Sequence, residues 1–462
     1  MDSFTNTKPL KALLVGIQLP KLSDEEMQGS LAELGRLVTT LGYEVIGQTS
    51  QRRNSEKGAT VLGDGKLKDL AEWTGGTGVI GPMVVKKKHK AALKFAKNIE
   101  LEDDEEEFEE DEGEEDFEGS TPKKERAQIV IFDCDLSPSQ LRNLESATGV
   151  PVLDRTGVII EIFSRHARTR AARLQVEIAR LTYVAPRLRE TGGNEDRGGG
   201  KAGETSIELD RRKIRDRIKE LKEELGSIAQ EHDVRRARRN QEISVALVGY
   251  TNAGKSSLMR ALTGSDVLVA DKLFATLDTT VRLLYHESRP KILISDTVGF
   301  IKKLPHDLVA SFKSTLDEAL NASLLLYVVD SSDPTFRSQL EVTKTVLGEV
   351  GAGDVESFMV LNKVDRLMPE ELLALRAEYP EAIFLSAHNP EHVAAMRQRL
   401  ITYFETAMVD LEIFIPYDVQ GAIGEIRAKL KVLSEEYDNN GLTLKVRGHM
   451  EDIDRLKTRF GL

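Results

Sequence analysis

The residues best suited to chemistry are 249–256, which read Gly-Tyr-Thr-Asn-Ala-Gly-Lys-Ser. Two glycines separated by four residues and followed by Lys and Ser form the phosphate-loop pattern. An apolar run at 245–248 predicts a strand before the loop, and 257–262 predict a helix after it, which is the context that the pattern requires. Backbone N–H groups and the helix N-terminus then surround the phosphates. We predict a nucleotide site with Lys255 at the β- and γ-phosphates and Ser256 on Mg²⁺.

A second motif, Asp296-Thr-Val-Gly299, ends another apolar run. A carboxylate at a strand tip can hold Mg²⁺ directly or through water, and Gly299 can offer its N–H to the γ-phosphate, so that the following segment becomes a switch ordered by GTP. Three threonines, Thr276, Thr279 and Thr280, lie between the two motifs, where a switch threonine is expected. Taken alone, the tetrapeptide would equally suit a strand that ends in a turn.

A third motif, Asn362-Lys-Val-Asp365, indicates which base is bound. The Asp365 carboxylate can accept two hydrogen bonds from guanine N1 and N2, and a base without those donors would leave the carboxylate unpaired. Ser386 and Ala387 follow a further predicted strand, where a backbone N–H could reach the base O6. The order and spacing of these motifs predict a GTPase and not a general ATPase.

One position departs from many GTPases. Phe300 follows Gly299, where a water-orienting glutamine is common. A phenyl ring cannot position water, so we expect slow intrinsic hydrolysis and a partner or ion that completes the site. The Asn252 amide could help to hold a monovalent cation near the α- and γ-phosphates, and we therefore expect K⁺ to stimulate turnover.

The length of 462 residues suggests about three domains. The pattern predicts a multidomain α/β protein with an N-terminal α/β subdomain (1–163), a helical coiled-coil hairpin (164–240), a doubly wound GTPase domain (241–406) and a small α+β domain (407–462). In the first part we predict strands at 11–17, 43–48, 128–132 and 151–154 and a helix at 30–41. In the GTPase domain we predict strands at 243–248, 281–285, 292–296, 324–330, 358–362 and 383–386. At the C-terminus we predict strands at 411–416 and 442–446 and helices at 422–433 and 453–460.

The hairpin is predicted from apolar residues that recur every three or four positions on either side of a Gly-rich break. They are Leu174, Ile178, Leu181, Ala185 and Leu188, then Ile207, Ile214, Ile218, Leu221, Leu225 and Ile228. Pro186 should end or kink the first helix. Residues 164–240 carry twenty Lys and Arg against thirteen Asp and Glu. Such a surface is either simply solvated or neutralises a phosphate backbone, and the near absence of aromatics argues against base stacking.

Residues 102–118 contain fourteen acids and no base, and without them the net charge of −12 becomes +2. Such a run repels itself and buries little apolar area, so we predict a disordered insertion at 101–126. It is either a solvated loop or an acidic arm that competes with nucleic acid for a basic surface. No run approaches the ~20 apolar residues of a membrane helix, and the N-terminus lacks a secretory signal. We therefore expect a cytoplasmic protein without membrane insertion, a monomer, with its one cysteine, Cys134, buried.

Several segments resemble the HflX family of translational GTPases. They are 249–257, 274–278 (Phe-Ala-Thr-Leu-Asp) and 296–300 in the GTPase part; 132–141, 152–155 and 165–170 in the leading part; and 203–205 with Glu208 and 210–212 in the hairpin. Two features depart from the family pattern, namely the acidic insertion and the irregular Gly-rich connector at 197–203.

The resemblance implies that the N-terminal subdomain and hairpin bind the large ribosomal subunit, its rRNA and proteins. It also implies that the GTP-bound form separates stalled 70S ribosomes under stress, with hydrolysis stimulated by the ribosome. Thr276 would be the switch threonine and a third Mg²⁺ ligand beside Ser256 and Asp296, and the catalytic set would be Lys255, Thr276 and Gly299. The arginines expected on RNA are Arg165, Arg168, Arg170, Arg211, Arg212 and Arg215. The residues expected to contact GTP or GDP are Gly249, Tyr250, Thr251, Asn252, Ala253, Gly254, Lys255, Ser256, Ser257, Phe274, Ala275, Thr276, Asp296, Thr297, Val298, Gly299, Asn362, Lys363, Val364, Asp365, Ser386 and Ala387.

Two other readings stay open. The chain could be a GTP-gated adaptor whose hairpin docks a protein, with hydrolysis serving only as a timer. It could also remodel RNA with a second nucleotide at Gly63-Asp-Gly-Lys66, although this fragment lacks the full motif and is expected to be a turn.

Overall fold

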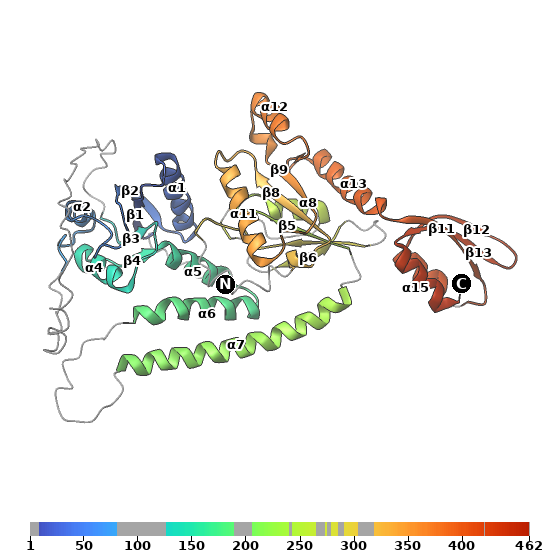
Figure 1. The fold of residues 1–462 in the computed structure, drawn as a ribbon, viewed down its shortest axis with the longest axis horizontal. Helices are drawn as coiled ribbons and strands as arrows, with labels where there is room; N and C mark the ends of the chain where they lie inside the picture. Colours follow the sequence, from blue (N-terminus) through green and yellow to red (C-terminus); the bar gives the residue numbers. More distant parts are fainter. Residues whose placement is uncertain are drawn as a thin grey trace, which may run out of the picture. The chain divides into compact units, whose positions relative to one another are not determined.

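A computed structural model describes residues 9–80, 126–188, 206–239, 243–264, 273–274, 279–284, 291–303, 318–419 and 421–461 (Figure 1). The chain forms two compact units, Met1–Val158 and Ile159–Leu462. Both are built from strands and helices, so the predicted multidomain α/β class is confirmed. The predicted four-part division stays a prediction, and the acidic run at 102–118 lies outside the described residues.

The first unit is a parallel four-stranded sheet in the order β2-β1-β3-β4. Its strands are β1 (Lys11–Gln18), β2 (Glu44–Arg52), β3 (Ile129–Phe132) and β4 (Val152–Asp154), and its helices are α1 (Asp24–Thr40), α2 (Asp64–Thr74) and α4 (Pro138–Thr148). All four residues of β3 are buried, as expected for a parallel sheet covered on both faces. Cys134 is buried in the core on one of these faces, as predicted.

Two predictions in this unit are wrong. The helix predicted at 30–41 begins at Asp24, because Ser23 and Glu26 form a capping box that satisfies its first N–H groups. The turn predicted at 63–66 is the start of α2, with Gly63 at the N-cap and Leu67 and Leu70 buried one turn on. β2 ends eleven residues before Gly63, so the strand that a phosphate loop requires does not precede it directly.

A buried ion network ties helix α5 (Arg155–His166) to the first sheet. Arg155 donates to Asp133 at 2.6 Å (Nη1 to Oδ1) and also to Glu33 of α1, and all three side chains are almost fully buried. Breaking such a network by removing one partner would leave an uncompensated buried charge. Since α5 starts at Arg155, the helical region begins nine residues before the predicted start at Ser164.

Helices α6 (Arg170–Val184) and α7 (Ser206–Arg239) run side by side as the predicted antiparallel hairpin (Figure 1). Leu221 is fully buried between Leu174 and Ile178. Ion pairs from Arg217 to Glu177 and from Arg170 to Glu224 fix the antiparallel register. α6 ends at Val184 and gives way to the short 3₁₀ helix η1 (Ala185–Arg187), which contains Pro186, as predicted.

The GTPase part holds a six-stranded sheet in the order β10-β9-β8-β5-β7-β6, in which only β6 is antiparallel to its neighbour. The strands are β5 (Ile243–Val248), β6 (Thr280–Leu283), β7 (Ile292–Asp296), β8 (Leu324–Asp330), β9 (Ser357–Asn362) and β10 (Ile383–Phe384). Helices α8 (Lys255–Thr263) and α13 (Pro390–Thr406) cover one face, and α11 (Phe336–Val350) and α12 (Pro369–Glu378) pack on the other. The doubly wound sheet is confirmed, with the end of β10 two residues earlier than predicted.

A three-stranded antiparallel sheet, β11-β13-β12, follows at the C-terminus. It comprises β11 (Val409–Pro416), α14 (Ala422–Lys429), β12 (Lys431–Tyr437), β13 (Gly441–Gly448) and α15 (Met450–Phe460). The helix predicted to run to Leu433 ends at Lys429 instead, because Lys431 starts a strand that pairs with β13. None of the described helices combines the length and apolar character that crossing a membrane requires.

Candidate nucleotide site

The two glycines of the phosphate loop occupy positions that no larger residue could take. Gly249 directly follows β5 and has φ 151°, and a Cβ there would lie 2.2 Å from the Val328 carbonyl oxygen. Gly254 has φ 93° and would place a Cβ 2.3 Å from the Asn362 amide nitrogen. These contacts and dihedrals exclude side chains, so the loop can turn sharply from β5 into the N-terminus of α8, where an anion is favoured.

Lys255 contacts the backbone of the loop. Its ammonium donates to the carbonyls of Gly249 (3.0 Å) and Tyr250 (2.9 Å), and the residue is 6% exposed. Burial lowers the pKa of Lys255 to about 8, and the negative charge of Asp296 opposes that shift. Nucleotide phosphates would favour the charged ammonium.

Ser256 and Asp296, the two residues predicted to share a magnesium ion, contact each other at the start of α8. The Ser256 hydroxyl donates to Asp296 Oδ2 at 2.6 Å, and Asp296 is fully buried. A hydroxyl and a carboxylate are hard oxygen ligands of the kind that Mg²⁺ prefers. Within the described ranges no group of three or more His, Cys, Asp and Glu side chains could hold a metal ion, and the shared magnesium site stays a prediction.

Phe300 is part of the framework of the loop. Its N–H donates to the Gly249 carbonyl (3.1 Å), its carbonyl accepts from the Thr251 N–H (2.8 Å), and the residue is 2% exposed. Gly299 lies so close that a Cβ would be 2.7 Å from the Thr251 Cα. The position of the usual glutamine therefore holds a buried ring, in agreement with the expectation that this side chain does not orient water.

The guanine motif is joined to the loop by Asn362, which is 1% exposed. Its amide nitrogen donates to the Ala253 carbonyl (2.9 Å), and its amide oxygen accepts from the Ala387 N–H (3.1 Å). Asp365 is exposed, and a hydrogen bond from the Ser386 side chain holds the pKa of its carboxyl below the usual value. The exposed carboxylate is thus ionised at neutral pH.

The backbone donors predicted to reach the base O6 are both engaged inside the protein. The Ala387 N–H bonds to Asn362, and the Ser386 N–H donates to His392 Nδ1 at 3.1 Å. Recognition of O6 through Ala387 therefore requires its N–H to be shared with, or released from, Asn362.

Two residues that the sequence motifs did not single out, Asp330 and Phe163, contact residues of the site. The ammonium of Lys363 bridges the Asn252 carbonyl (2.8 Å) and Asp330 Oδ2 (2.7 Å), at the end of β8. The N–H of Phe274 donates to the Thr251 hydroxyl (3.1 Å), and the Phe274 ring meets Phe163 of α5 edge to face at 4.6 Å. Ala275 and Thr276 lie outside the described residues.

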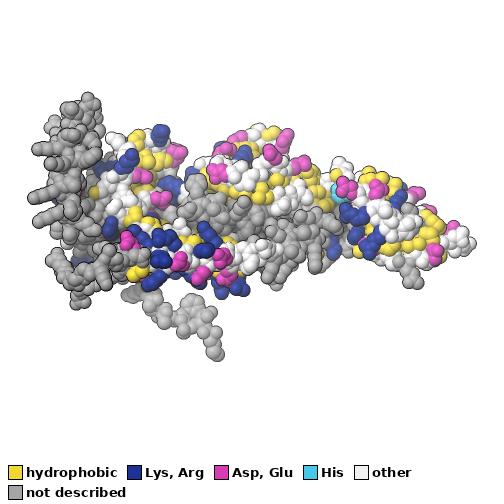
Figure 2. Space-filling view, turned by 60° about the horizontal axis from the view of Figure 1, so that its bottom comes forward, with side chains coloured by type: hydrophobic (Ala, Val, Ile, Leu, Met, Phe, Trp, Pro, Cys, Tyr) yellow, Lys and Arg dark blue, Asp and Glu magenta, His cyan; other side chains and the backbone are white. Residues whose placement is uncertain are grey.

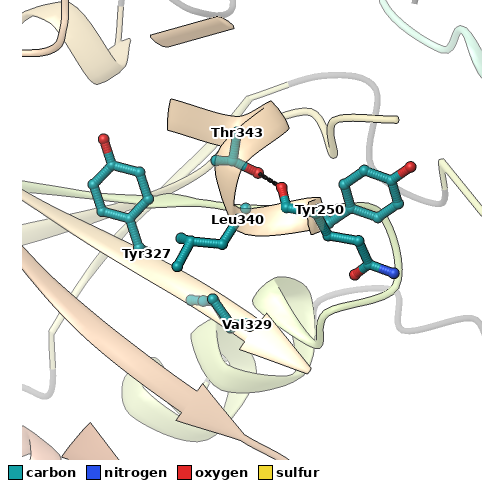
Figure 3. A pocket seen from close by; sticks show the side chains of 8 residues that line it. Tyr250, Tyr327, Val329, Leu340 and Thr343 are labelled. Carbon is teal, nitrogen blue, oxygen red and sulfur yellow. Dashed lines mark hydrogen bonds between the residues drawn. The ribbon is translucent and has the colours of Figure 1, made fainter. Parts of the chain in front are cut away.

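A small cavity lies behind the beginning of the loop (Figure 3). It is lined by Gly249, Tyr250, Tyr327, Val328, Val329, Gln339, Leu340 and Thr343. The Thr343 hydroxyl donates to the Gln339 carbonyl at 2.9 Å, one turn earlier in α11. Because neither Lys255, Ser256 nor Asp296 lines it, this cavity is distinct from the phosphate site.

The six candidate RNA-binding arginines are all exposed, but they do not form one cluster. Arg165, Arg168 and Arg170 lie around the start of α6, whereas Arg211, Arg212 and Arg215 lie in the first turns of α7. The antiparallel register puts these two groups at different ends of α6, about 15 Å apart at 1.5 Å per residue. On the face shown in Figure 2, basic side chains over the hairpin alternate with acidic ones. Arg165 pairs with Glu161, and Arg170 pairs with Glu224.

Comparisons with known proteins agree with this geometry. Three family models match, described as GTP-binding GTPase N-terminal (28–90 and 116–164), GTP-binding GTPase Middle Region (166–239) and 50S ribosome-binding GTPase (244–363). The GTPase HflX of Gluconacetobacter diazotrophicus is 58% identical over 96% of this chain and 97% of its own length. The chain belongs to the HflX family of GTPases.

A more distant relative gives the same family. The GTPase HflX of Caldanaerobacter subterraneus is 36% identical over 97% of this chain and 93% of its own. The structure of a GTP-binding protein from Sulfolobus solfataricus in complex with GDP matches with a TM-score of 0.42 and 21% identity, over 85% of this chain and 100% of that one. The predicted HflX resemblance is confirmed, and the chain is a GTPase that binds GTP. Residues 91–115, which include most of the acidic run, fall between the two segments that the N-terminal model matches.

Replacing Asp365 by Asn tests the base reader of this HflX GTPase. The amide would offer a donor where guanine also offers one, so preference should move from GTP towards xanthosine triphosphate by about tenfold or more. Competition of the two nucleotides against a fluorescent GDP analogue measures the shift. Unchanged guanine preference would show that the reader lies elsewhere.

Proposed function

We propose that this GTPase binds the large ribosomal subunit and dissociates stalled 70S ribosomes under stress, with its hydrolysis stimulated by the ribosome. The observation that carries the proposal is the match of residues 244–363 to a family described as a 50S ribosome-binding GTPase. The exposed arginines of the hairpin, which lie in two groups, support it, because guanidinium groups that contact a phosphate backbone displace its counterions. On this proposal the protein works in the cytoplasm, as a monomer.

In the proposed nucleotide complex, the backbone N–H groups of 249–256 surround the phosphates and Lys255 turns from the loop carbonyls to the β- and γ-phosphates. Ser256, Asp296 and Thr276 would hold Mg²⁺, which neutralises charge that develops on the phosphates. The 2.6 Å contact between Ser256 and Asp296 supports this, since it already brings two oxygen ligands together. Asp365 would read guanine, and the N–H of Gly299 would sense the γ-phosphate.

Hydrolysis is proposed to be conditional. Phe300 is buried and both its backbone groups bond to the loop, so this residue supplies no group that could orient water. The proposed role of the ribosome is therefore to complete the site, either by ordering the switch or by supplying a polar group. Such completion accelerates hydrolysis strongly in GTPases that depend on a partner.

We also propose that Asn252 contributes to a K⁺ site next to the phosphates. Its side chain is exposed at the rim of the loop, while its carbonyl is held by Lys363. GTP turnover should therefore be faster in K⁺ than in Na⁺ at equal ionic strength, and Asn252→Ala should remove the difference. Equal turnover of the unmodified protein in both salts would contradict a K⁺ site.

The hairpin proposal predicts a salt-dependent interaction with purified 50S subunits. With a non-hydrolysable GTP analogue, the chain should pellet with 50S subunits, and the affinity should fall steeply as salt rises. Replacing Arg211, Arg212 and Arg215 together by Gln should weaken binding and lower the salt slope by up to about three, one per lost phosphate contact.

Arg217→Gln is the matched control for this experiment. Arg217 lies on the same helix and is half-exposed, but its guanidinium is already paired with Glu177 and Glu220. Its loss should leave the salt slope nearly unchanged. If the chain does not pellet with 50S subunits and a protein bait captures it in a GTP-dependent way, the adaptor reading replaces the ribosomal one.

A further inference from the structure

Asp330 lies outside the GTP-binding motifs, yet it contacts one of their charged residues directly. The Lys363 ammonium donates to Asp330 Oδ2 at 2.7 Å and to the Asn252 carbonyl of the phosphate loop at 2.8 Å. The side chains of Lys363 and Asp330 are only 15% and 16% exposed. Because water screens this pair weakly, it is stronger than an ordinary surface ion pair.

The carboxylate of Asp330 is itself fixed. Its second oxygen, Oδ1, accepts from the Ser332 N–H (3.0 Å) and the Ser332 hydroxyl (2.6 Å). Asp330 is the last residue of β8 and stands opposite Asn362, the last residue of β9, in the parallel register. The sheet therefore sets Asp330 next to Lys363, and the turn after β8 orients its carboxylate.

The backbone on both sides of the Lys363–Asn252 contact is held in an unfavourable conformation. Asn252 has φ 60° and Lys363 has φ 62°, both in the left-handed region. The left-handed region is unfavourable for residues with a Cβ, more so for Lys than for Asn, so surrounding contacts must hold Lys363 there. The Lys363 ammonium joins the two residues, and Asp330 is the charged group that keeps the ammonium in place.

We propose that Asp330 is a positioning residue that sets the affinity for guanine nucleotides by orienting Lys363, and through it the loop carbonyl of Asn252. This inference rests on the guanine site proposed above. Asp330 does not touch the residues proposed at the reacting phosphates, Lys255, Ser256 and Asp296. Its loss should therefore weaken nucleotide binding without altering the chemical step.

Asp330→Asn keeps the size of the side chain and removes its charge. A charge-assisted hydrogen bond is worth enough that dissociation of a fluorescent GDP analogue should accelerate about tenfold. KM for GTP should rise by a similar factor, while turnover at saturating GTP stays within about twofold. Unchanged GDP dissociation in this variant would overturn the inference.

Asp333→Asn is the matched control. Asp333 follows β8 by three residues, and its carboxylate accepts from Thr335 and Gln339, which belong to the same turn and helix. A general disturbance of this turn would accelerate GDP release in both variants and would overturn a specific role for Asp330. A second variant, Asp330→Ser, also removes the carboxylate and should accelerate GDP release in the same way. The thermal midpoint of each nucleotide-free variant shows whether faster release reflects misfolding instead.

A double-mutant cycle with Lys363→Met isolates the route of action. If Asp330 acts through Lys363, then Asp330→Asn should add nothing to the dissociation rate in the Lys363→Met background. An equal acceleration in both backgrounds would overturn the inference while leaving the guanine site intact. Lys363→Met without any effect on GDP release would contradict the guanine site itself, and the inference with it.

Discussion

A phosphate loop must turn its N–H groups towards the ligand, which forces its carbonyls to find donors elsewhere. Four of these carbonyls have donors from outside the loop's own backbone. Gly249 is bonded by Lys255 and Phe300, and Tyr250 by Lys255. Asn252 is bonded by Lys363, and Ala253 by Asn362. Segments more than a hundred residues apart thus converge on one turn, and the rest of the nucleotide site is arranged around it.

This constraint gives the motif residues two tasks. Asn362 and Lys363 belong to the guanine motif, but their side chains also support the phosphate loop. Lys255 also supports the loop, because its ammonium donates to the carbonyls of Gly249 and Tyr250. Burial lowers the pKa of Lys255 in this position, and bound phosphates would replace the carbonyls as its partners. Phe300 forms hydrogen bonds to the loop through both its N–H and its carbonyl. Because Phe300 occupies the position of the water-orienting glutamine, the chain has no such glutamine there. Its GTP hydrolysis is therefore proposed to depend on a partner.

Much of the site could be predicted because its chemistry is written in short, ordered motifs. The proximity of Ser256 to Asp296 and the burial of Cys134 follow from strand order and residue type. Asp330 could not be found in this way, since its role depends on the register of β8 beside β9 and on a turn that no motif encodes. Phe163 was also missed, because its partner Phe274 lies 111 positions later in the sequence.

The wrong predictions of helix boundaries have similar causes. The helix predicted through Leu433 failed because the pairing of Lys431–Tyr437 with β13 is a tertiary contact that overrides local periodicity. The early start of α1 could have been foreseen, since Ser23 and Glu26 are a capping box in the sequence itself. The two groups of hairpin arginines separate only once the antiparallel register is known.

We propose that this guanine-nucleotide site hydrolyses GTP slowly until the large ribosomal subunit completes it. GTP turnover by the purified chain, alone and with saturating 50S subunits in the same K⁺ buffer, tests this proposal. The rate should rise by about tenfold or more with 50S subunits. Rapid turnover by the chain alone, unchanged by 50S subunits, would contradict it.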